Sequence, residues 1–523
     1  MQISFASLEP RPALSPLDGR YGPAVAPLVD YLSEAALNRA RLFVEIEWFK
    51  HLMDHQILPG TQALDGMERD YLDGIGQRFG PDEIAELAAI ERETVHDVKA
   101  VEYFLQRRLA GAPDVLGPYT VLGPALNPVI HFALTSEDVN SLAYALMVRG
   151  AVTQVWAPAA RALVDDLAGL AHATANCAML ARTHGQPATP TTLGKELAVM
   201  AHRLERQLKR VSAAEYLGKL NGATGTYGAH VAAAPNVDWP GVSRAFVEGL
   251  GLTWNPLTTQ IESHDWQAEL YNDIGRFGRI AHNVATDLWT YISLGYFVQA
   301  RGHGTVGSST MPHKVNPIRF ENAEANLELS GALLDALAQT LVTSRLQRDL
   351  TDSTTQRNIG VALGHAQLAI DNLRRGLAGL DVDPAALAAD LAANPEVLAE
   401  PIQSAMRAAA LAGVDGMDQP YERLKEFTRG RRVTLEQLRA FITDLGLPAD
   451  AAGRLRALDP ANYTGLAAEL VRDYLPVPQD RSNGASVGAP SGAPSGAPSG
   501  VGRVGMVGGE AASETSSKEE HND

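Results

Sequence analysis

The feature that most constrains the fold is a set of apolar residues that recur every three or four positions over long stretches of chain. Three such series cover residues 193–211, 270–291 and 327–341. This spacing places apolar side chains on one face of an α-helix. No proline, which would break a helix, lies between Leu257 and Met311. The pattern predicts an all-α fold around a bundle of long parallel and antiparallel helices, whose apolar stripes also pack against other chains.

Segments rich in proline and glycine divide the rest of the chain. One covers residues 109–128, another opens at residues 379–391, and residues 488–499 repeat Gly-Ala-Pro-Ser. The repeat has no periodic apolar face, so burial cannot offset the entropy of ordering it. We therefore predict three helical domains and a disordered tail: an N-terminal domain 1–124, a central long-helix domain 125–377, a C-terminal domain 378–477 and the tail 478–523.

Composition excludes several classes of protein. The 523 residues carry a net charge of −17, which argues against a nucleic-acid binder because such domains are rich in clustered Lys and Arg. The single cysteine, Cys177, excludes an intramolecular disulfide and a cysteine-based zinc site. Apolar runs of about 18 residues are absent, so we expect no membrane span and a cytoplasmic protein.

Two motifs have the spacing of a cofactor site, one for a dinucleotide and one for a metal ion, but the sequence around each does not favour such a site. Gly302, Gly304 and Gly307 match the dinucleotide-binding spacing, but that motif needs a strand before it and a helix opening on it. Here a long helical pattern precedes it, and we interpret the glycines as a hinge. His51 and His55 share a helix face. They lack a third ligand in register and lie where that helix ends, so we interpret them as helix-end histidines.

The segment SSTMPHKVNP, residues 308–317, gathers Ser308, Ser309, Lys314 and Asn316 directly after the glycines. A serine hydroxyl is a poor base in water, but a nearby cation and backbone N–H groups can stabilise its alkoxide in a dehydrated site. Nothing around it resembles a nucleophile elbow, which disfavours acyl-enzyme chemistry. We predict a mobile catalytic loop that closes over a small charged substrate.

Three further motifs each allow a structural and a functional interpretation. Thr135 and Asp138 have the spacing of a capping box, which can be only a helix start or also a cradle for an anion. His184 lies in a proline-bounded turn. It is either a structural residue or a proton donor that the turn holds in a fixed position. The arginines near Ser353, in residues 344–357, form either a solvated helix surface or an anion site.

Taken in order, these stretches resemble the fumarase/aspartase superfamily, and within it the bacterial type of the adenylosuccinate lyase family. The resemblance covers residues 12–476. It rests on GSSTMPHKVNP (307–317) together with SPLDGRYG (15–22), HDVKAVEYFL (96–105), TSEDVN (135–140), RTHGQPATP (182–190), TTQIE (258–262) and QRDLTDST (347–354).

The resemblance implies an all-helical homotetramer whose central helices form a bundle of twenty, with each active site assembled from three subunits. It implies two reactions of purine biosynthesis: adenylosuccinate to AMP plus fumarate, and the succinyl-carboxamide ribonucleotide (SAICAR) to its carboxamide (AICAR) plus fumarate. No metal or organic cofactor is implied, because the carbanion delocalises into the adjacent carboxylate of the substrate.

The resemblance also implies roles for individual residues. Ser308 would be the general base, His184 would protonate the departing nitrogen, and Glu321 would orient His184. The phosphate and neighbouring groups would be held by Arg20, Tyr21, Arg345, Arg348, Ser353 and Arg357. The succinyl part would be held by Thr135, Ser136, Gln260, Ser309, Lys314 and Asn316, while His96 and Asp97 match a further substrate-contacting motif.

Two departures and two rival functions accompany the resemblance. The connector at residues 109–128 is longer than expected, and the tail has no counterpart in the family pattern. The nearest rival is another fumarate-releasing enzyme, such as an argininosuccinate lyase, an aspartase or a fumarase. The arginine cluster and DGRYG (18–22) favour a nucleotide phosphate over those smaller substrates. A non-catalytic, crystallin-like relative is the other rival, and the joint presence of Ser308, His184 and Lys314 argues against it.

Overall fold

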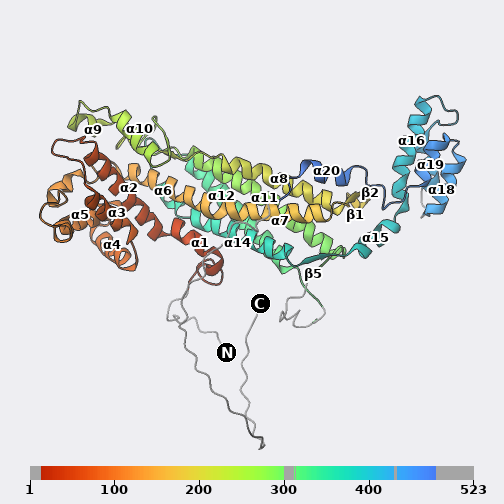
Figure 1. Ribbon diagram of the computed structural model, residues 1–523, viewed down its shortest axis with the longest axis horizontal. Coiled ribbons are helices and arrows are strands. Elements are labelled where there is room, and N and C mark those ends of the chain that lie inside the picture. The colour runs from red at the N-terminus through yellow and green to blue at the C-terminus, as the bar shows by residue number, and fades with distance from the viewer. Residues whose placement is uncertain (1–12, 300–310, 312–313, 429–432, 479–523) are drawn as a thin grey trace, which may run out of the picture. The chain divides into compact units, whose positions relative to one another are not determined.

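Five long helices form the centre of the fold. In this computed structural model they are α7 (Ala157–Ala173), α8 (Leu193–Ser212), α11 (Asp265–Ser293), α12 (Ile318–Leu341) and α14 (Ile359–Leu377). Helix α11 packs against α8 and α12, α14 packs against α12 and α7, and α7 packs against α8, as Figure 1 shows. The predicted all-α architecture is confirmed.

The apolar series of the sequence form the buried faces of these helices. In α11, Leu270, Ile274 and Phe277 are each about 1% exposed, and the pattern continues to Leu288. The matching residues of α8 and α12, such as Leu204 and Leu334, are equally buried. Burying such side chains contributes about 1.5–3 kcal/mol each, which makes this interface a main source of stability.

The N-terminal helices pack on one another and share a single apolar core with the central helices. They are α1 (Gly22–Leu32), α2 (Glu34–Asp54), α3 (Gly66–Gln77), α4 (Pro81–Thr94) and α5 (Asp97–Leu116). The connector predicted from residue 109 begins later, because α5 continues through Pro113 to Leu116. A proline so close to the C-terminus of a helix removes only one hydrogen bond.

Shorter elements link α5 to α14. The helical ones are η1 (Pro124–Val129), α6 (Ser136–Ala151), the π turn η2 (Val152–Trp156), α9 (Gly228–Ala233), α10 (Trp239–Gly249) and α13 (Thr351–Gln356). The strands of the described chain form three two-stranded sheets: antiparallel β1 (Ala178–Thr183) with β2 (Gln186–Thr192), parallel β3 (Leu217–Gly218) with β4 (Thr253–Trp254), and antiparallel β5 (Phe297–Gln299) with β6 (Leu380–Val382).

Residues 398–455 enclose a separate apolar core, which includes Ile402, Met406 and Ile442, whereas Leu387 and Val471 belong to the main core. The elements after β6 are α15 (Pro384–Ala392), η3 (Pro395–Leu398), α16 (Ala399–Leu411), α17 (Pro420–Thr428), α18 (Leu435–Asp444), α19 (Ala449–Arg456) and α20 (Ala467–Tyr474). The division into domains 1–124, 125–377 and 378–477 stays a prediction.

The structure describes residues 13–299, 311, 314–428 and 433–478. The predicted hinge glycines, the two serines Ser308 and Ser309, and all of the predicted disordered tail except Pro478 lie outside these residues. Within them, none of the helices combines the length and apolarity needed to cross a membrane.

Candidate active site

The first turn of α6 carries the predicted capping box. The Asp138 carboxylate accepts a hydrogen bond from the Thr135 N–H at 2.8 Å, which confirms that Thr135 caps this helix. The Thr135 hydroxyl oxygen accepts a hydrogen bond from the Gln260 side-chain amide at 3.2 Å. Two motifs far apart in sequence, TSED and TTQIE, therefore meet at one helix N-terminus.

A fully buried ion pair holds this turn in place. Lys219 Nζ lies 2.7 Å from Asp138 Oδ1, and both side chains are 0% exposed. The same carboxylate accepts hydrogen bonds from the backbone N–H groups of Asn221 and Gly222. With four donors, the buried carboxylate is well satisfied and the turn is fixed. Sequence reasoning missed Lys219, because nothing near it in the chain indicates its partner.

Glu137, beside Asp138, joins α6 to the arginine cluster. Its Oε1 lies 2.7 Å from Arg348 Nη2, and it also accepts a hydrogen bond from Asn140 at 2.7 Å. Burial raises the pKa of Glu137, while Arg348 and the Asn140 hydrogen bond act in the opposite direction. Arg348 is thereby held at the first turn of α6 and keeps a buried Nε without a partner among the described residues.

The first turn of α5 brings in the predicted pair His96 and Asp97. His96 Nδ1 accepts a hydrogen bond from the backbone N–H of Lys99 at 3.2 Å, so His96 caps α5. Asp97 lies between two arginines, 2.8 Å from Arg41 and 3.3 Å from Arg357. Burial opposes ionisation, but Arg41 and Arg357 together lower the pKa of Asp97. Asp97 is therefore a carboxylate at neutral pH.

A buried histidine connects α13 to the start of α11. His264 Nε2 lies 3.4 Å from Asp352 Oδ2, and Gln356 donates a hydrogen bond to His264 Nδ1 at 3.3 Å. All three side chains are buried. The contact positions α13, which carries Ser353 and is followed by Arg357. Sequence reasoning missed His264, which lies two residues after the end of TTQIE and has the left-handed φ of 62°.

A cavity of about 140 Å³ lies between residues 15–33 and α14, with Arg357 in its lining. Its other lining residues are mostly apolar, including Leu17, Val25 and Val361. Arg20 and Tyr21 belong to the same N-terminal segment, and the Tyr21 hydroxyl accepts a hydrogen bond from Asn322 at 3.4 Å. An apolar wall with a guanidinium at its edge suits a ligand that is part ring and part anion.

His184 lies on a different part of the chain. Thr183 pairs with Gln186, which leaves a two-residue turn of His184 and Gly185 between β1 and β2. Both have positive φ, 55° and 76°, as in the type I′ turn that matches the twist of a hairpin. Arg182 anchors the hairpin by binding Tyr296 and Asp390, each at 2.7 Å. The His184 side chain is exposed and has no partner within the described residues.

The remaining predicted residues are also exposed. Glu321, in the first turn of α12, accepts a hydrogen bond from the Trp289 indole at 3.2 Å. Lys314 and Asn316 lie exposed just before α12. Arg345 pairs only loosely with Asp349, at 3.4 Å, and its side chain is 83% exposed. These residues present their polar groups to the surface of the single chain.

The chain keeps these two sets of residues apart. From Ser136 to Ala173 the helices α6, η2 and α7 form one run, and at about 1.5 Å per residue it is roughly 55 Å long. Thr135 precedes its start, whereas the β1–β2 hairpin follows its end and lies beside α15, at the other side of the bundle (Figure 1). Within one chain, Thr135, Gln260, Arg348, Asp97 and Arg357 are brought together, and His184 is not.

The site contains groups for binding anions and for transferring a proton. Helix N-termini, hydroxyls and arginines bind carboxylate and phosphate, and an imidazole can give or take a proton. The described residues contain no group of three or more His, Cys, Asp or Glu that could hold a metal ion. The rings of His51 and His55 instead lie 4.3 Å apart, tilted by 34°, where α2 ends, and burial lowers the pKa of His51 to about 4.

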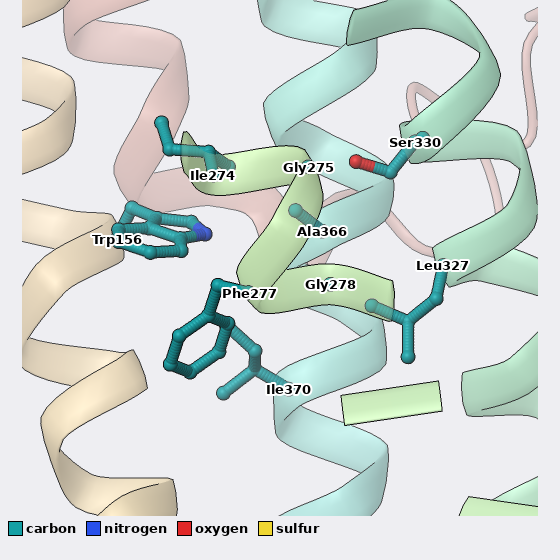
Figure 2. Close-up of a pocket in the computed structure, with 10 residues that line it drawn as sticks. Trp156, Ile274, Gly275, Phe277, Gly278, Leu327, Ser330, Ala366 and Ile370 are labelled. Carbon is teal, nitrogen blue, oxygen red and sulfur yellow. The ribbon is translucent and has the colours of Figure 1, made fainter. Parts of the chain in front are cut away.

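The cavity in Figure 2 is a gap in helix packing rather than a site. Apolar side chains from α11, α12 and α14 surround it, among them Phe277, Leu327 and Ile370, and the glycines Gly275 and Gly278 leave the space. Its volume of about 10 Å³ is at the lower limit for a single water molecule.

Comparison with known proteins covers nearly the whole described chain. Residues 19–328 match the family described as "Lyase", and residues 344–464 match the family described as "Adenylosuccinate lyase C-terminal". Adenylosuccinate lyase of Escherichia coli (strain K12) is 47% identical over 459 residues, which cover 88% of this chain and 98% of that protein. The adenylosuccinate lyase of Vibrio cholerae is also 47% identical, with the same coverage.

Two solved structures share the fold at low sequence identity. The fumarate lyase from Mesorhizobium sp. BNC1 aligns with a TM-score of 0.65 at 19% identity, covering 86% of this chain and 97% of that one. The 3-carboxy-cis,cis-muconate lactonizing enzyme from Pseudomonas putida aligns with a TM-score of 0.63 at 21% identity, covering 86% and 95%.

Proposed function

Because the chain belongs to the adenylosuccinate lyase family, we propose that it eliminates fumarate from adenylosuccinate, giving AMP, and from SAICAR, giving AICAR. The observation that carries this proposal is the cluster at the start of α6, where Thr135 and Gln260 meet and Arg348 lies bound to Glu137. A carboxylate site beside arginines suits a substrate that carries both a succinyl group and a phosphate.

The proposed binding roles follow the positions of the side chains. Thr135, Ser136 and Gln260 bind a succinyl carboxylate at the N-terminus of α6, where N–H groups and the helix dipole favour negative charge. Arg348, Ser353 and Arg357 bind the phosphate side of the substrate, together with Arg20, Tyr21 and Arg345. His96 and Asp97 complete the pocket from α5. Ser309, Lys314 and Asn316 complete the succinyl site.

The proposed chemistry is a β-elimination with a base and an acid on opposite sides of the substrate. Ser308 removes the proton next to a succinyl carboxylate, and its alkoxide is stabilised by Lys314 and backbone N–H groups. The electron pair left on carbon forms the double bond of fumarate as the carbon–nitrogen bond breaks. His184, oriented by Glu321, protonates the departing nitrogen.

We propose that the active site is shared between chains of a cytoplasmic homotetramer. His184 and Glu321 are exposed on one chain, and the helical run from Ser136 to Ala173 separates His184 from the anion cluster. A second and a third copy would supply His184 and the segment 308–316 to the cluster of the first. The exposed apolar side chains Trp289 and Leu329 on α11 and α12 would be buried between these copies.

Fumarate release from defined substrates tests the function. Purified protein is incubated separately with adenylosuccinate, SAICAR, argininosuccinate, aspartate and malate. We expect fumarate from the first two. Fumarate from argininosuccinate, aspartate or malate alone would move the chain to another branch of the superfamily, and no fumarate from any of them would support a non-catalytic relative.

A further inference from the structure

Arg41 lies in the interior of α2 with its side chain 2% exposed, a costly place for a charge. Each of its three nitrogens meets an oxygen. Nη2 lies 2.8 Å from Asp97 Oδ2, Nε donates to Asn140 Oδ1 at 2.8 Å, and Nη1 donates to Asn38 Oδ1 at 3.2 Å. A planar guanidinium with three fixed acceptors has one orientation, so its partners are fixed relative to one another.

The partners of Arg41 lead to both arginines of the anion cluster. On one side, Asp97 Oδ2 also contacts Arg357 Nη2 at 3.3 Å. On the other side, Asn140 donates to Glu137 Oε1, the oxygen that pairs with Arg348. Arg41 is thus the branch point of a continuous polar network that runs from Arg357 through α2 and α6 to Arg348.

We propose that Arg41 is a positioning residue of the substrate site, which sets the spacing of Arg348 and Arg357 through Asp97 on one side and Asn140 with Glu137 on the other. This inference rests on the proposed function, because it assumes that both arginines bind the phosphate side of the substrate. Arg41 itself is too buried to contact a ligand. Its effect reaches the substrate only through the groups that it holds.

A purely structural role predicts something different. Buried ion pairs add little net stability compared with apolar groups of the same shape. If Arg41 served stability alone, its replacement would change the unfolding temperature but not the KM or the affinity for AMP. The chain offers a matched control: Arg161 of α7 pairs with Glu205 of α8, an interhelical ion pair outside the network described above.

The first experiment compares the variants Arg41→Met, Arg41→Lys and Arg161→Lys by steady-state fumarate release and by calorimetric binding of AMP. For Arg41→Met we expect the KM for adenylosuccinate and the Kd for AMP to rise about tenfold, the effect of misplacing one charge-assisted hydrogen bond, with a much smaller change in kcat. Lysine keeps the charge but cannot hold Asp97 and Asn140 together. We expect Arg41→Lys to fall between Arg41→Met and wild type, and Arg161→Lys to match wild type.

The second readout is the pH profile of kcat/KM. The charged or titratable groups that face Asp97 are Arg41, Arg357 and His96, whose Nδ1 lies 3.9 Å away. Removing Arg41 raises the pKa of Asp97, so the acid limb of the profile moves to higher pH in Arg41→Met and less in Arg41→Lys. A structural role lowers the unfolding temperature without moving this limb.

The possible outcomes distinguish a failure of the positioning role from a failure of the proposed fumarate-releasing activity. If wild-type protein releases no fumarate from adenylosuccinate or SAICAR, the proposed function fails. If wild type is active but folded Arg41→Met keeps its KM, AMP affinity and pH profile, the positioning role is wrong. If Arg41→Met does not fold, the variant Asn140→Leu tests the role instead, because it removes only the connection from Arg41 to Glu137. A raised Kd for AMP in Asn140→Leu supports the positioning role, and an unchanged Kd overturns it.

Discussion

The start of α6 and the turn that carries His184 lie at the two ends of one helical run, and they are built in opposite ways. At the start of α6, the charged groups Asp138, Lys219 and Glu137 are buried and bonded to one another. At the turn, the His184 side chain is exposed and has no partner within the described residues. The buried ion pairs of the first end form within a single chain. The other presents a reactive group to the surface.

This difference suits a division of the proposed function, with substrate binding at α6 and the chemical step at the turn. Binding groups that are held by buried ion pairs are preorganised before any substrate arrives. The proposed proton donor, on a hairpin turn, depends instead on the hairpin's anchors, Arg182 with Tyr296 and Asp390. We expect changes at α6 to alter substrate affinity, and changes at the turn to alter the rate of the chemical step.

The largest effect is expected from His184→Ala. Positioned proton transfer typically supplies about 10²–10⁴-fold in rate, so kcat for fumarate release should fall by that factor while AMP binding is retained. Ser308→Ala should have an effect of similar size through loss of the base. Stopped-time fumarate assays with calorimetry on the same samples measure both. A His184→Ala protein with near-normal kcat would remove His184 from the acid role.

Mixing the two inactive variants tests whether sites are shared. If Ser308 and His184 of one site come from different chains, hybrid tetramers of Ser308→Ala and His184→Ala contain some intact sites. Random assortment restores about one site in four. The measurement is fumarate release after the variants are unfolded and refolded together, with each refolded alone as control. Absence of any recovery, with hybrids demonstrated by mass spectrometry, would place both residues in one chain.

A moderate effect is expected at the α6 end of the helical run. Arg348→Met removes the guanidinium at the first turn of α6 and leaves Glu137 buried without its cation. KM for adenylosuccinate should therefore rise about tenfold to a hundredfold. Arg375→Met is a suitable control, because Arg375 pairs with Asp371 on its own exposed helix face. An equal rise in KM for both variants would contradict a specific role for Arg348.

The smallest effect is expected at His51, which belongs to neither end. Burial lowers its pKa to about 4, with help from the nearby His55 and against Asp54. The unfolded chain takes up this proton near pH 6.5, well before the folded one, so stability falls as the pH drops from about 6.5 to 4. His51→Phe should remove part of that loss, less than about 1 kcal/mol because His51 is partly exposed. Urea unfolding at pH 7.5 and pH 5 compares the two proteins, and an unchanged pH dependence would contradict the expectation.

The sequence alone predicted the regular parts of the molecule. Apolar residues such as Leu270 and Leu334 follow the helix period, so the long helices could be read directly, and the spacing of Thr135 and Asp138 indicated the start of α6. The hairpin around His184 was not foreseen, because β1 lacks an alternating apolar pattern. The pairs Asp138–Lys219 and Arg41–Asp97 join segments far apart in the chain, and nothing local to any of these residues indicates its partner.

The helical run from Ser136 to Ala173 has a consequence for how such a protein can change. Within one chain it fixes the separation between the anion cluster and the proposed proton donor, and its π turn at η2 already holds one extra residue in a coil. Adding or deleting a single residue there would displace the distal hairpin by about 1.5 Å and rotate it by about 100°. Under the proposed function, no substitution at either end could correct that error, so the length of this segment becomes part of the catalytic apparatus.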